Sequence, residues 1–323
     1  MTPPTPDSAA LRHAPAWRGD GLSEPTHWTV PLDATAGELL VQATRRLRPS
    51  HGWPEPLRPE DFPVEPQAAW ATRVRRLLRT IGFAVVDDFP VAAVGGDADL
   101  TLWLLAGLFG EPIRQNIEGQ RVDRVRNEGR ATVRGAKTNR ALGFHTDFAN
   151  ATPDVFGLLT VREAAEGGES LLASGHLAYR ALAAEDPECV ATLEGEFLFD
   201  RSGDVPENEP PLVPSPVFRR SGDELRVLYN RARIHRGHRA AGRPLTRQET
   251  RAFDALDAHL AAPGVALRHR LRRGQVLFVN NRWMLHSRTA FTDGPDSGHR
   301  RELLRVWLRA AAPTSVQTPT PGS

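Results

Sequence analysis

The chain contains a single cysteine, Cys189, and a single lysine, Lys137. One cysteine cannot form a disulfide within the chain, and it excludes a zinc site built from several cysteines. The positive charge is almost entirely arginine, and the formal net charge is only +2. Because no block of five or six like charges occurs, we expect neither a nucleic-acid partner nor a charged membrane-binding patch.

Long hydrophobic runs are also missing. No stretch approaches the roughly 20 apolar residues that a membrane-crossing helix needs, and the N-terminus lacks the apolar run of a secretory signal. Together with the scarcity of cysteine, which suits a reducing compartment, this predicts a cytoplasmic protein. The 323 residues are long enough to bury a core and enclose a pocket. Association into a homo-oligomer is left open.

Both ends of the chain are rich in proline and small residues, so 1–20 and 313–323 are predicted to be disordered tails around a single domain at 21–312. Helical spacing of apolar residues occurs at 35–47, 66–80, 97–109 and 246–261. Strand patterns occur at 82–90, 155–161, 169–173, 196–199, 224–229, 267–271, 275–280 and 303–308. Helices first and many spaced strands later indicate an α+β fold with a β-sandwich or barrel core.

His145 and Asp147 are two residues apart, so an extended backbone would direct both side chains to the same side. His286, after the apolar run QVLFVNN, is the best candidate for a third metal ligand. Two histidines and one carboxylate form a facial ligand set that leaves positions open on Fe(II). If His145 and Asp147 are considered alone, the alternative is that they cap a loop. Four other histidines lie in arginine-rich stretches and are predicted to be exposed: His235, His238, His269 and His299.

Several longer elements occur in a fixed order. They are GFAVVDDFP at 82–90, LAGLFGEPIRQN at 105–116, FHTDFANATPDVFGLLTVREAAEGGESLLAS at 144–174, LRRGQVLFVNNRWMLHSRTAF at 271–291 and RRELLRVWL at 300–308. In this combination the chain, over about residues 25–310, resembles the taurine dioxygenase/TfdA-like family of Fe(II)- and 2-oxoglutarate-dependent oxygenases. The resemblance implies a double-stranded β-helix, or jelly roll, with flanking helices.

The resemblance also implies roles for individual residues. His145, Asp147 and His286 match the iron ligands of the family. Arg301 matches the arginine that pairs with the distal carboxylate of 2-oxoglutarate, and a guanidinium can make two parallel hydrogen bonds to such a group. Ser170 stands where the family often has a threonine that contacts the same carboxylate.

Substrate contacts are predicted from the same comparison. Arg305 lies four residues after Arg301 and matches the arginine that binds the anionic group of the substrate in taurine dioxygenase; a packing or ion-pair role is the alternative. Phe148 and Asn150 flank the ligands and are predicted to line the substrate pocket, although Phe148 could equally pack in the core. Arg300 is expected to point away from Arg301 because side chains alternate along a strand. The pocket mouth is expected to include 114–142 and 200–222.

Other residues near the predicted site have two interpretations each. Residues close to His286 either orient the site or serve in turns and strand edges: Asn280, Asn281 and Arg288. The large tryptophans are predicted to pack in the core: Trp103, Trp283 and Trp307.

The resulting hypothesis is an oxidoreductase with Fe(II), 2-oxoglutarate and O2 as cofactor and co-substrates. It would hydroxylate, desaturate or cyclise a small anionic molecule and release succinate and CO2. Asp147 favours oxygenation over halogenation, because related halogenases lack this carboxylate. The alternative is a non-redox, cupin-like isomerase or hydrolase on a jelly roll, but Arg301 and the GGES segment would then have no purpose. A third hypothesis is a binding protein that kept the fold but lost catalysis. The presence of all three metal ligands argues against it.

Overall fold

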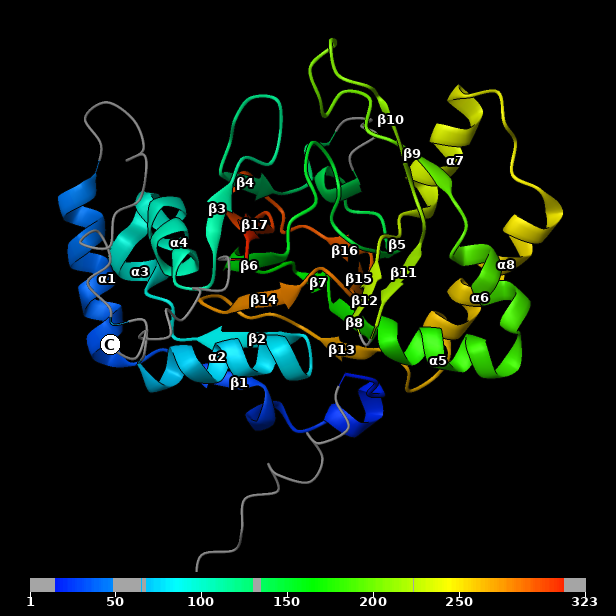
Figure 1. Cartoon of the computed structure of the whole chain (residues 1–323). Coiled ribbons are helices and arrows are strands. Elements are labelled where there is room, and N and C mark those ends of the chain that lie inside the picture. Colours follow the sequence, from blue (N-terminus) through cyan, green and yellow to red (C-terminus); the bar gives the residue numbers. More distant parts are fainter. Residues whose placement is uncertain (1–14, 49–64, 66–67, 130–134, 223, 311–323) are drawn as a thin grey trace, which may run out of the picture.

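The computed structural model describes residues 15–48, 65, 68–129, 135–222 and 224–310. Two sheets form its centre, and helices lie at both ends of them (Figure 1). The predicted tail 313–323 and most of the predicted tail 1–20 lie outside the described residues. Within the described part of the chain, no helix combines the length and the hydropathy needed to cross a membrane.

The larger sheet has seven strands. Their order is β1 (Thr29–Pro31), β2 (Phe83–Asp87), β14 (Val276–Asn280), β6 (Val155–Arg162), β17 (Glu302–Arg309) and β3 (Glu111–Ile113), and β4 (Val122–Val125) also pairs with β17. β1 and β2 are parallel, and the other pairs are antiparallel. The predicted strands at 82–90, 155–161, 275–280 and 303–308 are therefore confirmed, and they assemble into one sheet.

The smaller sheet has four strands in the order β13 (Leu267–His269), β8 (Ser170–Ser174), β15 (Met284–Arg288) and β5 (Leu142–His145). Three two-stranded pairs complete the β structure: β9 (Phe197–Asp200) with β10 (Leu212–Ser215), β11 (Phe218–Ser221) with β12 (Glu224–Val227), and β7 (Glu166–Gly167) with β16 (Phe291–Thr292). The α+β fold with a jelly-roll core, predicted from the sequence, is confirmed.

Helices lie in two groups (Figure 1). α1 (Ala34–Leu47), α3 (Val91–Val94) and α4 (Ala98–Gly107) gather at one end, and α2 (Ala69–Thr80) runs along β2. α5 (Gly175–Glu185), α6 (Pro187–Leu193), α7 (Arg231–Ala240) and α8 (Arg247–Ala261) gather at the other. The 3-10 turns are η3 (Gly19–Leu22), η4 (Pro25–His27), η6 (Gly95–Asp97), η7 (Gly135–Lys137) and η8 (Ser297–His299). The four helices predicted from the sequence are all present.

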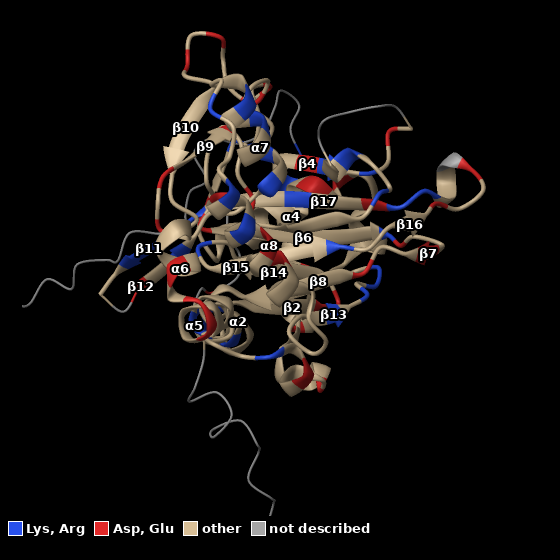
Figure 2. Cartoon of the chain, turned by 90° about the vertical axis from the view of Figure 1, so that its right-hand side faces the viewer, with Lys and Arg blue, Asp and Glu red and all other residues tan. Residues whose placement is uncertain are grey.

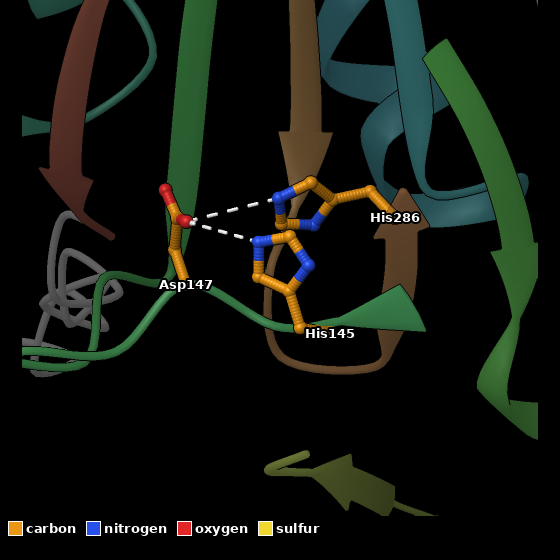
Figure 3. A group of neighbouring side chains, drawn as sticks. All are labelled: His145, Asp147 and His286. Carbon is orange, nitrogen blue, oxygen red and sulfur yellow. Dashed lines mark ion pairs between the residues drawn. The ribbon is translucent and has the colours of Figure 1, made fainter. Parts of the chain in front are cut away.

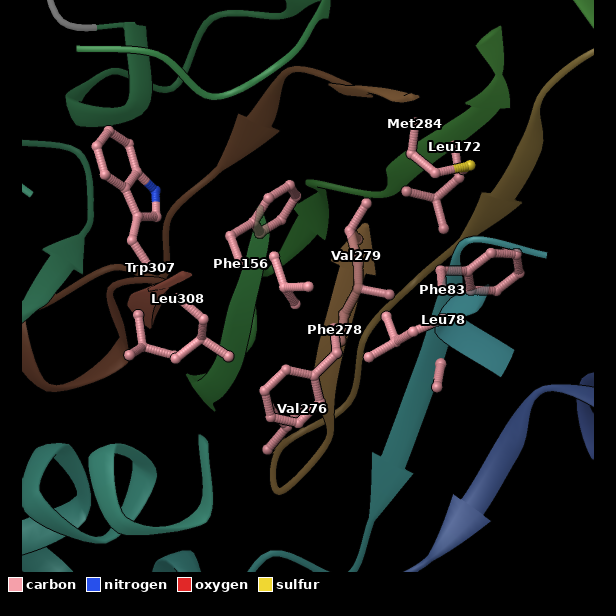
Figure 4. Close-up of a cluster of buried hydrophobic side chains, with 14 of the residues drawn as sticks. Leu78, Phe83, Phe156, Leu172, Val276, Phe278, Val279, Met284, Trp307 and Leu308 are labelled. Carbon is pink, nitrogen blue, oxygen red and sulfur yellow. The ribbon is translucent and has the colours of Figure 1, made fainter. Parts of the chain in front are cut away.

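The hydrophobic core explains why the central strands are apolar on both faces. β6 and β14 are buried along most of their length, because the smaller sheet covers one face and helices cover the other. Phe156, Phe278 and Trp307 are fully buried within this core (Figure 4). Each large apolar side chain removed from water contributes about 1.5–3 kcal/mol. α4 is apolar almost all round its circumference, as expected for a helix enclosed within a protein.

Residues 15–20, within the predicted disordered tail, are instead attached to the domain. The Trp17 indole donates a hydrogen bond to the carbonyl of Ile81 (2.7 Å), and its ring lies against Phe83. The amide of Gly19 donates to the carbonyl of Val265 (2.9 Å). Tertiary contacts therefore order a segment whose composition, rich in proline and alanine, carries no helical or strand pattern.

Helices α5, α6 and α7 were not predicted from the sequence patterns. In α7, seven of the ten residues are arginine, histidine or glycine, so no apolar spacing marks the helix. Its N-cap, Asn230, accepts a hydrogen bond from the amide of Arg233. His238, predicted to be exposed, is buried with 1% exposure. Its Nε2 accepts from the amide of Leu198, and its Nδ1 bonds the carbonyl of Arg243. The prediction for His238 was wrong because its side of the helix packs against β9, whereas the neighbouring Arg239 is exposed.

Gly237 lets α7 approach β9 closely. A Cβ atom at this position would lie 2.2 Å from the carbonyl oxygen of Leu198. We expect Gly237→Ala to destabilise the protein by about 1–3 kcal/mol through this clash, although alanine favours an isolated helix by about 1 kcal/mol over glycine. Chemical denaturation measures the change. The control is Gly96→Ala, whose Cβ meets nothing within 4 Å; equal stabilities of the two variants would refute the packing argument.

Candidate active site

The smaller sheet brings the two predicted histidine ligands together. β15 and β5 are antiparallel neighbours, and His286 is the register partner of His145. Asp147 lies two residues beyond His145, just after β5 ends. Its Oδ1 is 3.7 Å from Nε2 of His286 and 4.0 Å from Nε2 of His145 (Figure 3). One ligand atom from each residue lies within 4.8 Å of the others, which is the spacing that a shared metal ion requires.

The imidazoles are held in the form that a metal needs. Nδ1 of His145 bonds the carbonyl of Gly143 (2.9 Å), which leaves the lone pair of Nε2 for a metal. Burial lowers the pKa of His145, and burial together with the neighbouring His145 lowers the pKa of His286 to about 3. Both rings are therefore neutral at pH 7. Neutral histidine is the metal-binding form.

Asp147 is buried and held by the larger sheet. The Trp307 indole donates to its Oδ2 (2.7 Å), and Nη1 of Arg305 donates to both oxygens (3.2 and 3.3 Å). Burial alone would raise the pKa of Asp147, but Arg305, the two histidines and the indole hold it below its usual value. The carboxylate is therefore ionised and aimed at the histidines, as a metal ligand must be.

The backbone of Asp147 is fixed by Asn281, which is fully buried at the end of β14. Its Oδ1 accepts from the Asp147 amide (2.7 Å), and its Nδ2 donates to the carbonyls of Asp147 and Pro153 (both 2.9 Å). These hydrogen bonds support the interpretation that Asn281 orients the site, rather than the alternative of a turn or strand-edge role. Trp307 is buried as predicted, but its polar contact with Asp147 was missed, because burial patterns carry no information about where an indole N–H points.

These ligands fit Fe(II). Two neutral imidazoles and one carboxylate on adjacent positions form the set typical of non-haem iron sites. Nδ1 of His286 has no hydrogen-bond partner among the described residues, so the tautomer of this ring is not fixed by a neighbour and its Nε2 is free to ligate. When bound, Fe(II) would supply the activation of O2, while the protein positions the reactants.

An inner cavity extends from the ligands between the two sheets. It is lined by His286, Ser170 and Arg301, among other residues. Arg301 is buried, and its Nη1 has no hydrogen-bond partner within the described residues. Burial, with a contribution from Arg288, lowers the pKa of Arg301 to about 9. A buried cation with an unused donor suits a carboxylate ligand. Arg300, by contrast, is exposed, as alternation predicts.

An outer cavity of about 690 Å³ opens on the other side of the ligands. Its wall includes Arg305, Asp123, Lys137 and Phe148. Lys137 pairs with Asp123 (2.7 Å), whose other oxygen lies 3.6 Å from Nη2 of Arg305. Asn150, predicted to contact substrate, is absent from this lining, and its Nδ2 lies 3.4 Å from the Arg114 carbonyl.

The far wall of the outer cavity consists of residues of α7, Asp257 and Ala261 of α8, and Asp204 after β9. Arg233 pairs with Asp204 (2.8 Å) and lies over the Phe148 ring, and Arg236 pairs with Asp200 (2.7 Å). The arginines of α7 are blue in Figure 2. The cavity wall is therefore charged but internally paired.

A comparison with models of protein families identifies the class of protein. Residues 46–307 match the family described as taurine catabolism dioxygenase TauD, TfdA family. The chain belongs to this family, and it is a non-haem iron, 2-oxoglutarate-dependent dioxygenase with Fe(II), 2-oxoglutarate and O2 as its cofactor and co-substrates. The family membership supports the oxygenase hypothesis over the cupin-like alternative.

Individual similar proteins agree with this class. FR-33289 synthase of Streptomyces rubellomurinus is 26% identical over 316 residues, which cover 94% of this chain and 92% of that protein. An asparagine oxygenase in complex with Fe(II), 2S,3S-3-hydroxyasparagine and succinate has a TM-score of 0.62 at 22% identity, covering 87% and 93% of the two chains. The non-heme iron oxygenase OrfP, in complex with Fe and α-ketoglutaric acid, has a TM-score of 0.63 at 19% identity, covering 88% and 94%. Both structures share the fold of this chain.

Replacement of Trp307 tests its support of the metal ligand. Trp307→Phe removes the hydrogen bond to Asp147, so we expect Fe(II) affinity to fall roughly 10- to 100-fold, the usual effect of losing a group that orients a ligand. Anaerobic metal titration measures it. Trp28→Phe is the matched control, because it also removes a buried indole hydrogen bond, to the carbonyl of Leu22, but far along the chain from any ligand. Equal Fe(II) affinities for the two variants would contradict the assignment.

Replacement of Arg301 tests the inner cavity. Arg301→Gln removes the buried cation, and we expect the Kd for 2-oxoglutarate to rise about 10- to 100-fold, because a hydrogen bond to a charged group contributes about 1.5–3 kcal/mol. The visible charge-transfer band that forms when 2-oxoglutarate is added anaerobically to the Fe(II) protein reports binding. Fe(II) affinity without 2-oxoglutarate should not change, and the exposed Arg300→Gln is the control. A wild-type Kd in Arg301→Gln would rule out this role.

Proposed function

We propose that this dioxygenase hydroxylates a small anionic molecule of the amino-acid type, bound in the outer cavity with its anionic group on Arg305. The proposal rests on the position of Arg305, which borders both cavities and contacts the metal ligand Asp147. An anion held by this side chain would lie next to the metal, so the carbon atoms near the anionic group would be the ones closest to the site of oxidation.

Arg305 keeps donors for a substrate. Its Nε donates to Oε1 of Gln115 (2.9 Å), and its Nη1 donates to Asp147. Its Nη2, in contrast, has only the 3.6 Å approach to Asp123 among the described residues, which is beyond hydrogen-bond distance. The N–H groups on Nη2 are therefore available for a carboxylate or a similar anion.

A carboxylate acceptor beside Arg305 favours a substrate that carries one negative and one positive group. Asp123 is buried in the cavity wall and is the register partner of Arg305 across β4 and β17. An ammonium group next to the substrate anion would meet this carboxylate. Similar structures contain 3-hydroxyasparagine or (3S)-hydroxy-L-Arg, according to their descriptions, which supports the amino-acid type.

The residue roles complete the proposal. His145, Asp147 and His286 hold Fe(II), Arg301 and Ser170 hold 2-oxoglutarate, and Phe148 forms an apolar part of the substrate cavity. One atom of O2 enters the product and the other enters succinate, with release of CO2. Asn150 is left out of this assignment because its side chain turns to a backbone carbonyl.

Location and assembly are further proposals. A cytoplasmic location is supported by Cys189, which is buried and forms no disulfide. The single domain predicted at 21–312 is proposed to begin near residue 15, given the contacts of Trp17. Association into a homo-oligomer stays open, and size-exclusion chromatography with light scattering would measure it.

The substrate class is tested with a panel of amino acids, sulfonates and other small carboxylates, each paired with its neutral amide or methyl ester. We expect substrate-dependent succinate formation with an anionic member, and a product that gains one oxygen atom. Loss of two hydrogens would instead indicate desaturation or cyclisation. If neutral members are oxidised as well as anionic ones, the role of an anion is refuted.

Arg305→Gln then tests the assigned residue. We expect the preference for the anionic substrate over its neutral partner to shrink at least tenfold, as expected for the loss of a charge-assisted contact. The readout is the ratio of the activities on the two substrates. Arg305 also contacts Asp147, and a change in metal binding would affect both activities equally. An unchanged ratio assigns Arg305 to the support of Asp147 alone.

A further inference from the structure

Besides Arg305, two buried arginines border the inner cavity: Arg288 and Arg301. Arg288 follows His286 by two residues on β15, so both side chains share the face that looks toward the larger sheet. Arg301 precedes β17 and reaches the same cavity from the larger sheet. Both are buried, with exposures of 7% and 5%.

Within the described residues, neither guanidinium has a counter-ion. No carboxylate of the described residues forms an ion pair with Arg288 or Arg301, and Asp293 accepts from the backbone amide of Arg301 rather than from its side chain. The two guanidinium carbons lie 4.8 and 4.9 Å from the centre of the Phe291 ring. Burying charges without partners is expensive, so the cavity requires an anion.

Unused donors in the described part of the chain indicate where that anion would bind. Nε of Arg288 and Nη1 of Arg301 are buried and have no hydrogen-bond partner there. Ser170 is the register partner of Arg288 on the neighbouring strand β8 and lines the same cavity. Directly opposed residues on one sheet face are neighbours. Three donor side chains therefore border one small space.

A second nitrogen of Arg288 binds the segment that leads to the metal site. Its Nη2 donates to the carbonyls of Thr138 (2.7 Å) and Arg140 (2.5 Å). This segment continues into Leu142, which lines both cavities, and then into His145. One guanidinium thus contacts the inner cavity and the backbone that shapes the outer one.

We propose that Arg288 is a second cationic anchor for the distal carboxylate of 2-oxoglutarate, and that it ties segment 138–142 to the bound co-substrate. This inference rests on the assignment of the inner cavity to 2-oxoglutarate. The plain alternative is that Arg288 only fixes the loop. A loop-fixing residue would affect every ligand of the metal site alike, whereas a carboxylate anchor discriminates between ligands with and without that carboxylate.

The test compares 2-oxoglutarate with 2-oxopentanoate, which keeps the metal-chelating keto acid but lacks the distal carboxylate. Kd values are measured for both by anaerobic calorimetry on the Fe(II)-loaded, full-length protein. The wild type should prefer 2-oxoglutarate strongly. In Arg288→Gln we expect this preference to shrink about 10- to 100-fold, because a charge-assisted contact is lost. An unchanged preference, with both ligands weakened equally, overturns the inference in favour of loop fixing.

Matched variants make the result specific. Arg301→Gln should also reduce the preference, and the exposed Arg300→Gln should retain the wild-type preference. If the wild type itself does not prefer 2-oxoglutarate, the assignment of the cavity fails, and this outcome is distinct from failure of the role of Arg288.

A structure of the wild type answers the same question without a substitution. Crystals of the protein with Fe(II) and 2-oxoglutarate, grown anaerobically, should place a distal carboxylate oxygen within about 3.5 Å of a nitrogen of Arg288. A carboxylate held by Arg301 with Arg288 more than about 4 Å away would overturn the proposal even if the Arg288→Gln protein failed to fold.

Discussion

The buried carboxylate of Asp147 is the constraint on which the site depends. The smaller sheet delivers it just after β5, and the larger sheet holds it through Trp307 and Arg305. Asn281, at the end of β14, fixes the backbone on both sides of the same residue. An unpartnered buried carboxylate would cost several kcal/mol, so these donors make the ionised form stable. They also link the two sheets at the point where the metal binds.

Charge is organised differently in the two cavities. The inner cavity has two buried guanidiniums and, among the described residues, no carboxylate paired with either, so it is built for one anion. The outer cavity pairs its charges: Lys137 with Asp123, and Arg233 with Asp204. A wall of paired charges can exchange one internal contact for a substrate contact at small net cost, which suits small polar molecules that carry both signs.

The far wall of the outer cavity is formed by α7, by Asp257 and Ala261 of α8, and by Asp204. Ion pairs and the close approach at Gly237 join α7 to β9 and to the residues that follow it. No ligand of the metal belongs to these elements. The charged pairs of this wall face the outer cavity, whereas the inner cavity is lined by residues of the two sheets and the segments next to them.

Local patterns in the sequence predicted four of the helices and a candidate ligand set, but they missed α5, α6 and α7. The spacing of His145 and Asp147 and the apolar run before His286 each carry a physical signal that needs no tertiary knowledge. The helix at 97–109 was predicted from helical spacing, but the apolar surface all round α4 is seen only in the structure. The order of the longer motifs then led to the family and to the jelly-roll fold. Strand predictions succeeded where alternation or continuous burial was strong.

Tertiary structure alone decided what each polar side chain does. Trp307 was expected only to pack, and Arg305 either to bind substrate or to pack or form an ion pair. Both donate to a carboxylate about 160 residues away in the chain. His238 is buried although its neighbours are arginines, and Trp17 is ordered although its segment has no pattern. These contacts depend on strand register and on how a helix is rotated against a sheet. The sequence determined which groups carry the chemistry, and the packing of the two sheets determined which of them meet.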